Sequence, residues 1–274
     1  GSRVDASPER ILMEAVARER MWAYQPDKVL RWDVEALSSG IKGIADGRWR
    51  STFWQKNGRS TFSQVWRQFD PRGQIARATW RREDGSVLVF RPDGRDVVEI
   101  LPSAAEARAA LPGLEPKLRN ALTAYLDRQE SLRTLDFHSR RLAEWLNQPA
   151  LRTPGAVATL RGGVVAEWGE TYHITVVNAR PRGSPSILRA VHEYDVEKAS
   201  YRLLRLKSTV TYADGTTGLH ESRWMGYREA TDAEFEAHVP LELLRIGAPV
   251  VHVTPRELAM RHLRDLSRAL TSPN

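Results

Sequence analysis

Histidine and carboxylate side chains are the first candidates for chemistry in this chain, because they bind metals and move protons near neutral pH. Seven histidines occur in 274 residues, and none belongs to a His-Glu-x-x-His pair or a similar metal-binding motif. The run His192-Glu193-Tyr194-Asp195 and the pair His220-Glu221 come closest. If the run is a strand, its first and third side chains share one face and its two acids share the other, so they do not converge. The sequence therefore predicts no metal site and no cofactor.

Nucleophile motifs give no stronger signal. The chain has no cysteine, which excludes zinc ribbons, thiol nucleophiles and disulfide scaffolds. The sequence contains no G-x-S-x-G, P-loop or G-x-G-x-x-G motif. Carboxylates such as Glu167 and Asp195 have no partner at a defined spacing. We therefore expect no catalytic residues, and a hydrolase with two carboxylates facing each other across a cleft is kept as an alternative.

Aromatic and basic side chains are concentrated in residues 46–73, DGRWRSTFWQKNGRSTFSQVWRQFDPRG. Such interleaving is typical either of a surface that stacks bases and neutralises phosphates or of two strands of a sheet. The Asn57-Gly58 pair favours the second interpretation, because it predicts a two-residue hairpin turn. That turn would set Lys56 opposite Arg59 and fix the pairing of both strands.

This pairing sorts the aromatic rings to one side of the sheet. It sets Trp49 opposite Trp66 and Phe53 opposite Phe62, and the turn at residues 70–73 carries the pattern into the next strands. The resulting apolar face is interpreted either as a closed core or as the wall of a ligand cavity. Its predicted members are Trp49, Phe53, Phe62, Trp66, Trp80, Leu88 and Phe90.

The other side of the same sheet is predicted to carry a row of like charges, each opposite the next: Arg48, Arg67, Arg77, Arg91 and Arg95. Like charges in direct opposition destabilise a sheet, so the row needs an explanation. It is either an outer face solvated by water and neighbouring acids or a docking surface for an anionic polymer, lipid or acidic protein segment. The net charge of +7 favours anionic partners without choosing among them. Segregation of rings from guanidinium groups disfavours nucleic acid as the partner.

Turn signals and changes of hydrophobic period divide the chain into five parts. They are a helix over about 8–22, an antiparallel meander over 28–100, helices over 103–148, a second meander over 156–228 and a helix over about 255–270. This order predicts an α+β fold, in which a large curved antiparallel sheet, a half-barrel, has its concave apolar face covered by helices. The last helix carries a leucine stripe that either packs on its own domain or contacts a membrane surface.

Two stretches resemble a known family. The run VWRQFDPRGQIARATWRREDGSVLVFRPDG is similar to the strand and turn pattern of the lipoprotein carrier LolA and the periplasmic sigma-factor regulator RseB. The run HEYDVEKASYRLLRLKSTVTYADGTTGLHESRW, followed by ATDAEFEAHVP, resembles the late strands of extracytoplasmic parts of membrane-anchored anti-sigma factors. The resemblance covers about residues 8–240, with a helical insertion at about 103–148, and leaves 241–274 as a C-terminal extension.

The resemblance implies a non-catalytic, extracytoplasmic (periplasmic) domain that binds acyl chains or lipidated and unfolded protein segments between sheet and helices. The implied partner is a hydrophobic ligand or a protein segment, with a membrane surface as a further candidate. No site residue of the family transfers to this sequence one for one. We expect Gly1-Ser2 to be a cloning remnant, so that a signal peptide, a membrane anchor or a cytoplasmic domain could precede the chain in the full-length protein.

Overall fold

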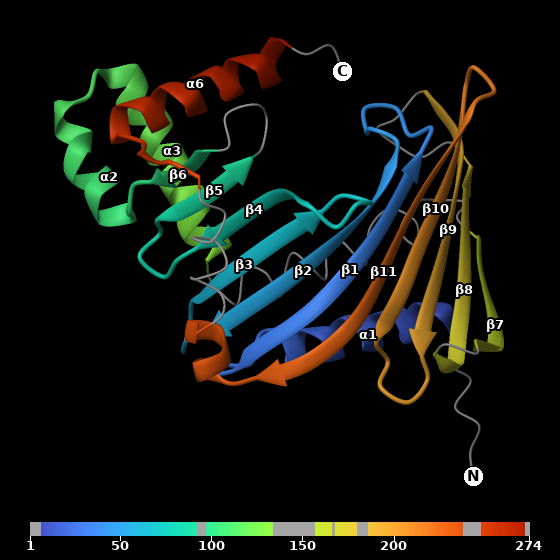
Figure 1. Cartoon of the computed structure of the whole chain (residues 1–274). Helices are drawn as coiled ribbons and strands as arrows, with labels where there is room; N and C mark the ends of the chain where they lie inside the picture. Colours follow the sequence, from blue (N-terminus) through green and yellow to red (C-terminus); the bar gives the residue numbers. More distant parts are fainter. Residues whose placement is uncertain are drawn as a thin grey trace.

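The computed structural model describes residues 7–91, 97–133, 157–165, 168–179, 186–237 and 248–271. Their dominant element is a single twelve-stranded sheet that does not close on itself (Figure 1). The first meander contains β1 (Val29–Ser39), β2 (Gly47–Asn57), β3 (Phe62–Phe69), β4 (Ile75–Arg81), β5 (Val87–Arg91) and β6 (Val97–Leu101). The second contains β7 (Val157–Val165), β8 (Gly169–Ala179), β9 (Ile187–Glu197), β10 (Leu203–Tyr212) and β11 (Thr217–Ala230).

The first and last long strands join the two meanders. β1 pairs antiparallel with both β2 and β11, so the sheet order is β12-β6-β5-β4-β3-β2-β1-β11-β10-β9-β8-β7. The short strand β12 (Val250–His252) pairs parallel to β6 at one edge, and β7 forms the other edge. The α+β half-barrel expected from the sequence is confirmed.

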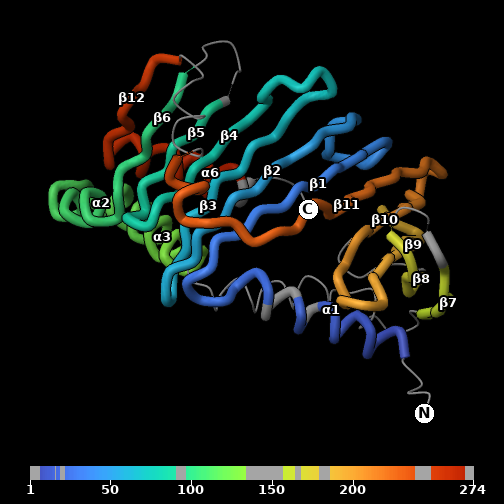
Figure 2. The backbone as a smooth tube through the Cα atoms, turned by 60° about the horizontal axis from the view of Figure 1, so that its bottom comes forward, coloured from blue at the N-terminus to red at the C-terminus, as the bar shows by residue number. Residues whose placement is uncertain are grey.

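Helices α1 (Pro8–Ala23) and α3 (Pro116–Leu132) lie on the same side of the sheet, which we call the concave face (Figure 2). The opposite side is called the convex face. Three further helical segments gather with α3 beside β6 (Figure 1): α2 (Ala104–Ala110), a 3₁₀ turn at Leu111–Gly113, and α6 (Pro255–Thr271). Residues 134–148 of the expected helical insertion lie outside the described residues.

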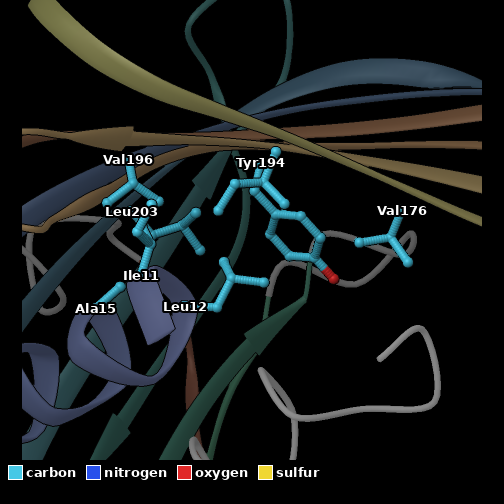
Figure 3. Close-up of a cluster of buried hydrophobic side chains, with 8 residues drawn as sticks. Ile11, Leu12, Ala15, Val176, Tyr194, Val196 and Leu203 are labelled. Carbon is cyan, nitrogen blue, oxygen red and sulfur yellow. The ribbon is translucent and has the colours of Figure 1, made fainter. Parts of the chain in front are cut away.

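Helix α1 begins where the sequence predicts, with Pro8 as its first residue and the Ser7 hydroxyl accepting a hydrogen bond from the Arg10 amide. Its apolar side chains Ile11, Leu12 and Ala15 are buried. Figure 3 shows them directed at side chains of β8, β9 and β10, namely Val176, Tyr194, Val196 and Leu203. One end of the concave face is thus closed by a packed core.

The group formed by α2, α3 and α6 has a core of its own. A capping box at Ser103 and Glu106 starts α2, as predicted. Leu122 of α3 is fully buried and belongs to the same apolar cluster as Leu258 of α6. The leucine stripe of the last helix therefore packs on its own domain, at least through its first turns, and Arg261 anchors that helix to Glu99 of β6 through two hydrogen bonds of 2.7 and 2.8 Å.

The connection between β2 and β3 differs from the predicted two-residue turn. Asn57 pairs with Phe62, and Phe53 lies opposite Trp66 rather than Phe62. The reason is that Asn57 remains part of β2. Its side-chain amide Nδ2 donates to the backbone carbonyls of Ala23 and Gln25, at 3.0 and 2.9 Å. The pairing moves by four residues, an even number, so the predicted sorting of faces between β2 and β3 survives.

The next hairpin contains a feature that the sequence did not reveal. The turn forms as predicted, with the Asp70 amide donating to Gln74 and Gly73 at a φ of 78°. Beyond it, a bulge shifts the register by one residue: Phe69 pairs with Ile75, but Gln68 pairs with Arg77. Because side chains alternate, this shift exchanges the predicted faces of the residues from Arg77 in β4 through β6, whereas Ile75 keeps its predicted face.

The prediction that the seven aromatic-face residues form one surface is therefore wrong, because they divide between the two faces of the sheet. Phe53, Phe62 and Trp66 lie on the concave face, and strand alternation puts Trp49 on the same side. Trp80, Leu88 and Phe90 lie on the convex face, where they pack with Trp54, Val65, Ala78, Val98 and Phe235 in a second core. A short helical turn at residues 232–237 carries Phe235 onto that core.

The same bulge removes the predicted arginine row. Arg67 lies on the convex face opposite Thr52 and Ala78, and its side chain is buried. Arg77 faces the concave side with Thr79 and lies opposite Gln68. Arg48 is exposed on the convex side of β2. The side chain of Arg91 and the whole of Arg95 lie outside the described residues, so of the five only Arg48 and Arg67 are found on one face.

Candidate functional site

Aromatic rings form a continuous strip over the concave face. Trp32 of β1 stacks on Phe53 of β2, with ring centroids 5.1 Å apart and an interplanar angle of 5°. Phe53 in turn stacks on Trp66 of β3 at 6.3 Å and 24°. Trp22 of α1 packs edge-on against Trp32 at 6.1 Å. The strip therefore runs from α1 toward α3, and its three strand residues are half-buried rather than closed off.

A pocket of about 390 Å³ opens where this strip passes beneath α3. The volume falls within the usual range for small-molecule sites, about 300–1,000 Å³. Strands β2 to β6 provide one wall and α3 the other, and the lining residues are Phe53, Phe62, Gln64, Trp66, Arg77, Thr79, Arg81, Val87, Val89, Leu101, Tyr125, Gln129 and Leu132.

Two guanidinium groups line this largely apolar pocket, those of Arg77 and Arg81, which lie four residues apart along β4. Arg77 lies over the Trp66 ring, 5.1 Å from its centroid. Arg81 donates to the Gln129 amide oxygen at 3.4 Å, and burial lowers its pKa below the usual value. Burial also raises the pKa of Tyr125, which lines the same pocket. The arrangement suits a ligand that has an apolar body and one acidic group.

Several lining residues were missed by sequence reasoning. Val87, Val89 and Arg81 alternate onto this face only because of the bulge in β4. Tyr125 and Leu132 belong to the apolar spacing of α3, which marks a buried helix side but not the surface it covers. Of the predicted residues, Phe53, Phe62, Trp66 and Arg77 meet in this pocket.

A second hollow, of about 500 Å³, lies at the far end of β2 beside the turn at residues 70–73. It is lined by Glu35, Arg48, Trp49, Arg50, Thr52, Phe69, Asp70, Pro71 and Gly73. Trp49 and Arg48, which were assigned to opposite predicted surfaces, are thus neighbours here. Beneath it, buried Asp33 accepts a hydrogen bond of 2.6 Å from Thr52 and lies 3.4 Å from an Arg50 nitrogen. Because acids and guanidinium groups alternate around it, we regard the pocket under α3 as the better ligand site.

The convex face of the second meander carries a network of alternating charges. The buried Asp195 carboxylate lies 2.7 Å from His173 Nδ1 and accepts a 2.6 Å hydrogen bond from Arg205 Nε. Glu193 Oε1 lies 3.4 Å from His173 Nε2. The two acids share this face and His192 takes the other, as predicted from alternation. Asp195 thus has two side-chain partners, His173 and Arg205, an arrangement that suits structural stabilisation better than proton transfer.

His192 and His220 lie on the concave face, two strands apart, with Ser208 between them. The Ser208 hydroxyl is 2.9 Å from His192 Nδ1, and burial lowers the pKa of His192. No group of three metal-binding side chains occurs within the described parts of the chain. No helix among these residues combines the length and apolar character needed to cross a bilayer. Glu167 lies outside the described residues.

No family model and no curated protein matches the sequence. Among solved structures, MucB in complex with MucA(peri) is similar over 82% of this chain and 56% of its own, at 11% identity and a TM-score of 0.39. A DUF1329 family protein from Desulfovibrio piger is similar over 85% of this chain and 98% of its own, at 12% identity and a TM-score of 0.31.

A LolA superfamily protein from Nitrosomonas europaea is similar over 83% of this chain and 96% of its own, at 10% identity and a TM-score of 0.28. The chain spans little more than half the length of MucB. These structures share at most 12% identity with the chain and have TM-scores below 0.4, so no family and no role is taken from them. The half-barrel fold follows from the strand order itself.

Proposed function

We propose that this chain is a non-catalytic binding domain that holds a hydrophobic ligand on the concave face, beneath α3. The observation that carries the proposal is the pocket of about 390 Å³ in which stacked rings meet two guanidinium groups. Apolar contact supplies the affinity, since each buried methylene contributes about 0.8 kcal/mol. Arg77 and Arg81 supply the preference for a ligand with an acidic group.

The role in the cell is the finer part of the proposal. We infer an extracytoplasmic domain that carries a lipid or lipidated segment, or senses one within a sigma-factor regulatory system. The sequence resemblance supports this role, whereas the geometry of the pocket supports only the class of ligand. A hydrophobic protein segment that ends in an acidic side chain would satisfy the same contacts.

A fluorescent fatty acid and its methyl ester test the proposal together. The acid should bind the folded protein at micromolar concentration and change the tryptophan emission, and the ester should bind more weakly because it cannot pair with a guanidinium group. Arg77→Gln should reduce the difference between the two probes. Arg82→Gln is the matched control, because Arg82 lies over Trp80 on the convex side, 4.9 Å from the ring centroid. Binding of neither probe would contradict the proposal.

A further inference from the structure

The outer edge of β7 is a long strand edge that no other described strand covers. β7 is the last strand of the sheet order, and in the described part of the chain it pairs with β8 alone. Its nine residues pair with β8 without interruption from Val157 to Val165. In such a strand every second residue directs its N–H and C=O groups away from the neighbour, so this edge offers a regular row of donors and acceptors.

Edge strands of folded proteins are normally short, charged, bulged or interrupted by proline. β12, at the opposite edge, is only three residues long. β7, with the sequence VATLRGGVV, contains no proline, no bulge and one charged residue. Four of its described side chains are open to solvent: Val157 is 59% and Leu160 37% exposed, and Thr159 and Arg161 are exposed as well. Among the described residues, none pairs with this edge, so an added strand would meet its backbone groups and its exposed apolar side chains.

The middle of this edge carries a positive charge on the convex face. Arg161, the central residue of β7, lies on the convex side with its pairing partner His173. On the other side, Lys198 Nζ is close to Gly162, since a Cβ added there would lie 3.6 Å from it. The same Lys198 lies over the Tyr172 ring, 5.4 Å from the centroid. An incoming strand with an acidic residue opposite Arg161 would be attracted on the convex side, whereas on the other side Lys198 already lies 3.9 Å from the Glu170 carboxylate.

Pairing with a second copy of the chain is disfavoured for the same reason. Two β7 strands that overlap along their whole length in antiparallel order would set Arg161 directly opposite Arg161. Like charges in that position destabilise strand pairing. The charge of Arg161 therefore disfavours pairing between two copies of β7 and favours pairing with an acidic segment of another chain.

We propose that β7 is a docking edge for an extended segment of another protein, which adds a strand to the sheet through its backbone. The segment has alternating apolar residues and an acidic residue opposite Arg161. This mode of recognition obtains affinity from main-chain hydrogen bonds and specificity from alternate side chains. The edge lies at the other end of the sheet from the pocket under α3, so it provides a separate interaction surface.

Charge reversal provides the test. Two synthetic nine-residue peptides of alternating Val and Thr, one with Glu and one with Arg at the centre, are titrated against the full chain and against Arg161→Glu. The wild type should bind the Glu peptide about tenfold more tightly than the Arg peptide, and Arg161→Glu should invert that order. Hydrogen exchange should show protection by the bound peptide of alternate amides in β7 and of none in β12. Unchanged thermal unfolding of the variant confirms that it is folded.

Three results would overturn the proposal. They are failure of the Glu peptide to protect β7 amides, the same peptide preference in wild type and Arg161→Glu, and self-association of the wild type with β7 amides protected in the absence of peptide. The last result, seen by analytical ultracentrifugation, would identify a second copy of the chain as the occupant.

Discussion

Trp66 and Trp80 provide a matched pair of variants for the division of the sheet into two faces. They lie on adjacent strands, both are half-buried, and each carries an arginine over its ring, Arg77 at 5.1 Å and Arg82 at 4.9 Å. The bulge in β4 nevertheless directs Trp66 to the concave pocket and Trp80 to the convex core. We therefore predict that Trp66→Leu weakens binding of an acyl ligand and that Trp80→Leu does not.

The size of the effect follows from the surface lost. Replacing the indole ring with a leucine side chain removes about 70 Å² of apolar contact with a ligand, which at about 25 cal/mol per Å² is worth about 1.8 kcal/mol. Loss of the ring also removes the contact that holds the Arg77 guanidinium group in place. The combined cost of about 2 kcal/mol corresponds to about 30-fold weaker binding. Trp80→Leu should instead lower the free energy of unfolding, because Trp80 packs against the convex core.

Isothermal titration with one fatty acid, together with chemical denaturation of each variant, separates the two effects. Equal loss of affinity in both variants would mean that the ligand does not distinguish the faces, and the assignment of the pocket would be wrong. Unchanged affinity in Trp66→Leu would mean that the ligand binds elsewhere.

Further predictions concern the stability of the fold around the site. Burial lowers the pKa of His192 below that of a histidine in the unfolded chain, about 6.5, so the unfolded chain takes up the proton first as the pH falls. The free energy of unfolding should therefore be greatest above about pH 6.5 and decrease as the pH is lowered. His192→Asn should flatten this dependence in thermal unfolding scans. Leu122→Ala, at a fully buried position of α3, should cost about 3 kcal/mol in denaturant unfolding, and exposed Lys117→Ala less than about 0.5 kcal/mol. Asp33→Ala should cost about 2 kcal/mol, because it leaves Arg31 and Thr52 without their buried acceptor, whereas Asp33→Asn should recover part of that loss by keeping the hydrogen bond with Thr52.

Local signals in the sequence located most of the elements. Serine and proline marked the start of α1, Asp70 to Gly73 marked the β3–β4 turn, and the capping box marked α2. Each of these signals depends on a few neighbouring residues, whose hydrogen bonds to the backbone or restricted backbone angles favour one local conformation.

Register depends on partners that the sequence does not identify. Asn57 next to Gly58 is a strong hairpin signal. The Asn57 side chain instead donates hydrogen bonds to Ala23, the last residue of α1, and to Gln25, which lies 32 residues earlier in the chain. The extra residue in β4 leaves no local mark, since Ala76 is an ordinary strand residue. The prediction therefore assembled Phe53, Phe62 and Trp66 correctly and assigned Trp80 to the wrong face.

Side-chain contacts between strands, and between strands and helices, could likewise not be predicted from the sequence. The pairing of His173 with Asp195 requires the register of the β8–β9 hairpin, for which the sequence between the strands offers no single turn type. The identity of the strands beneath α3 depends on how the helical group packs at one end of the sheet. The presence of an apolar helix side was predictable, whereas its position over Arg77 and Arg81 was not.

Photo-crosslinking of a diazirine-bearing fatty acid to the folded chain, with the adducts located by mass spectrometry, tests the central claim most directly. Adducts should fall on concave-face residues of β2, β3 and β5 and on α3, around Phe53, Phe62, Val89 and Tyr125. Two results would contradict a ligand site beneath α3. One is adducts on the convex core around Val65 and Leu88, and the other is no adduct anywhere in the chain at saturating probe.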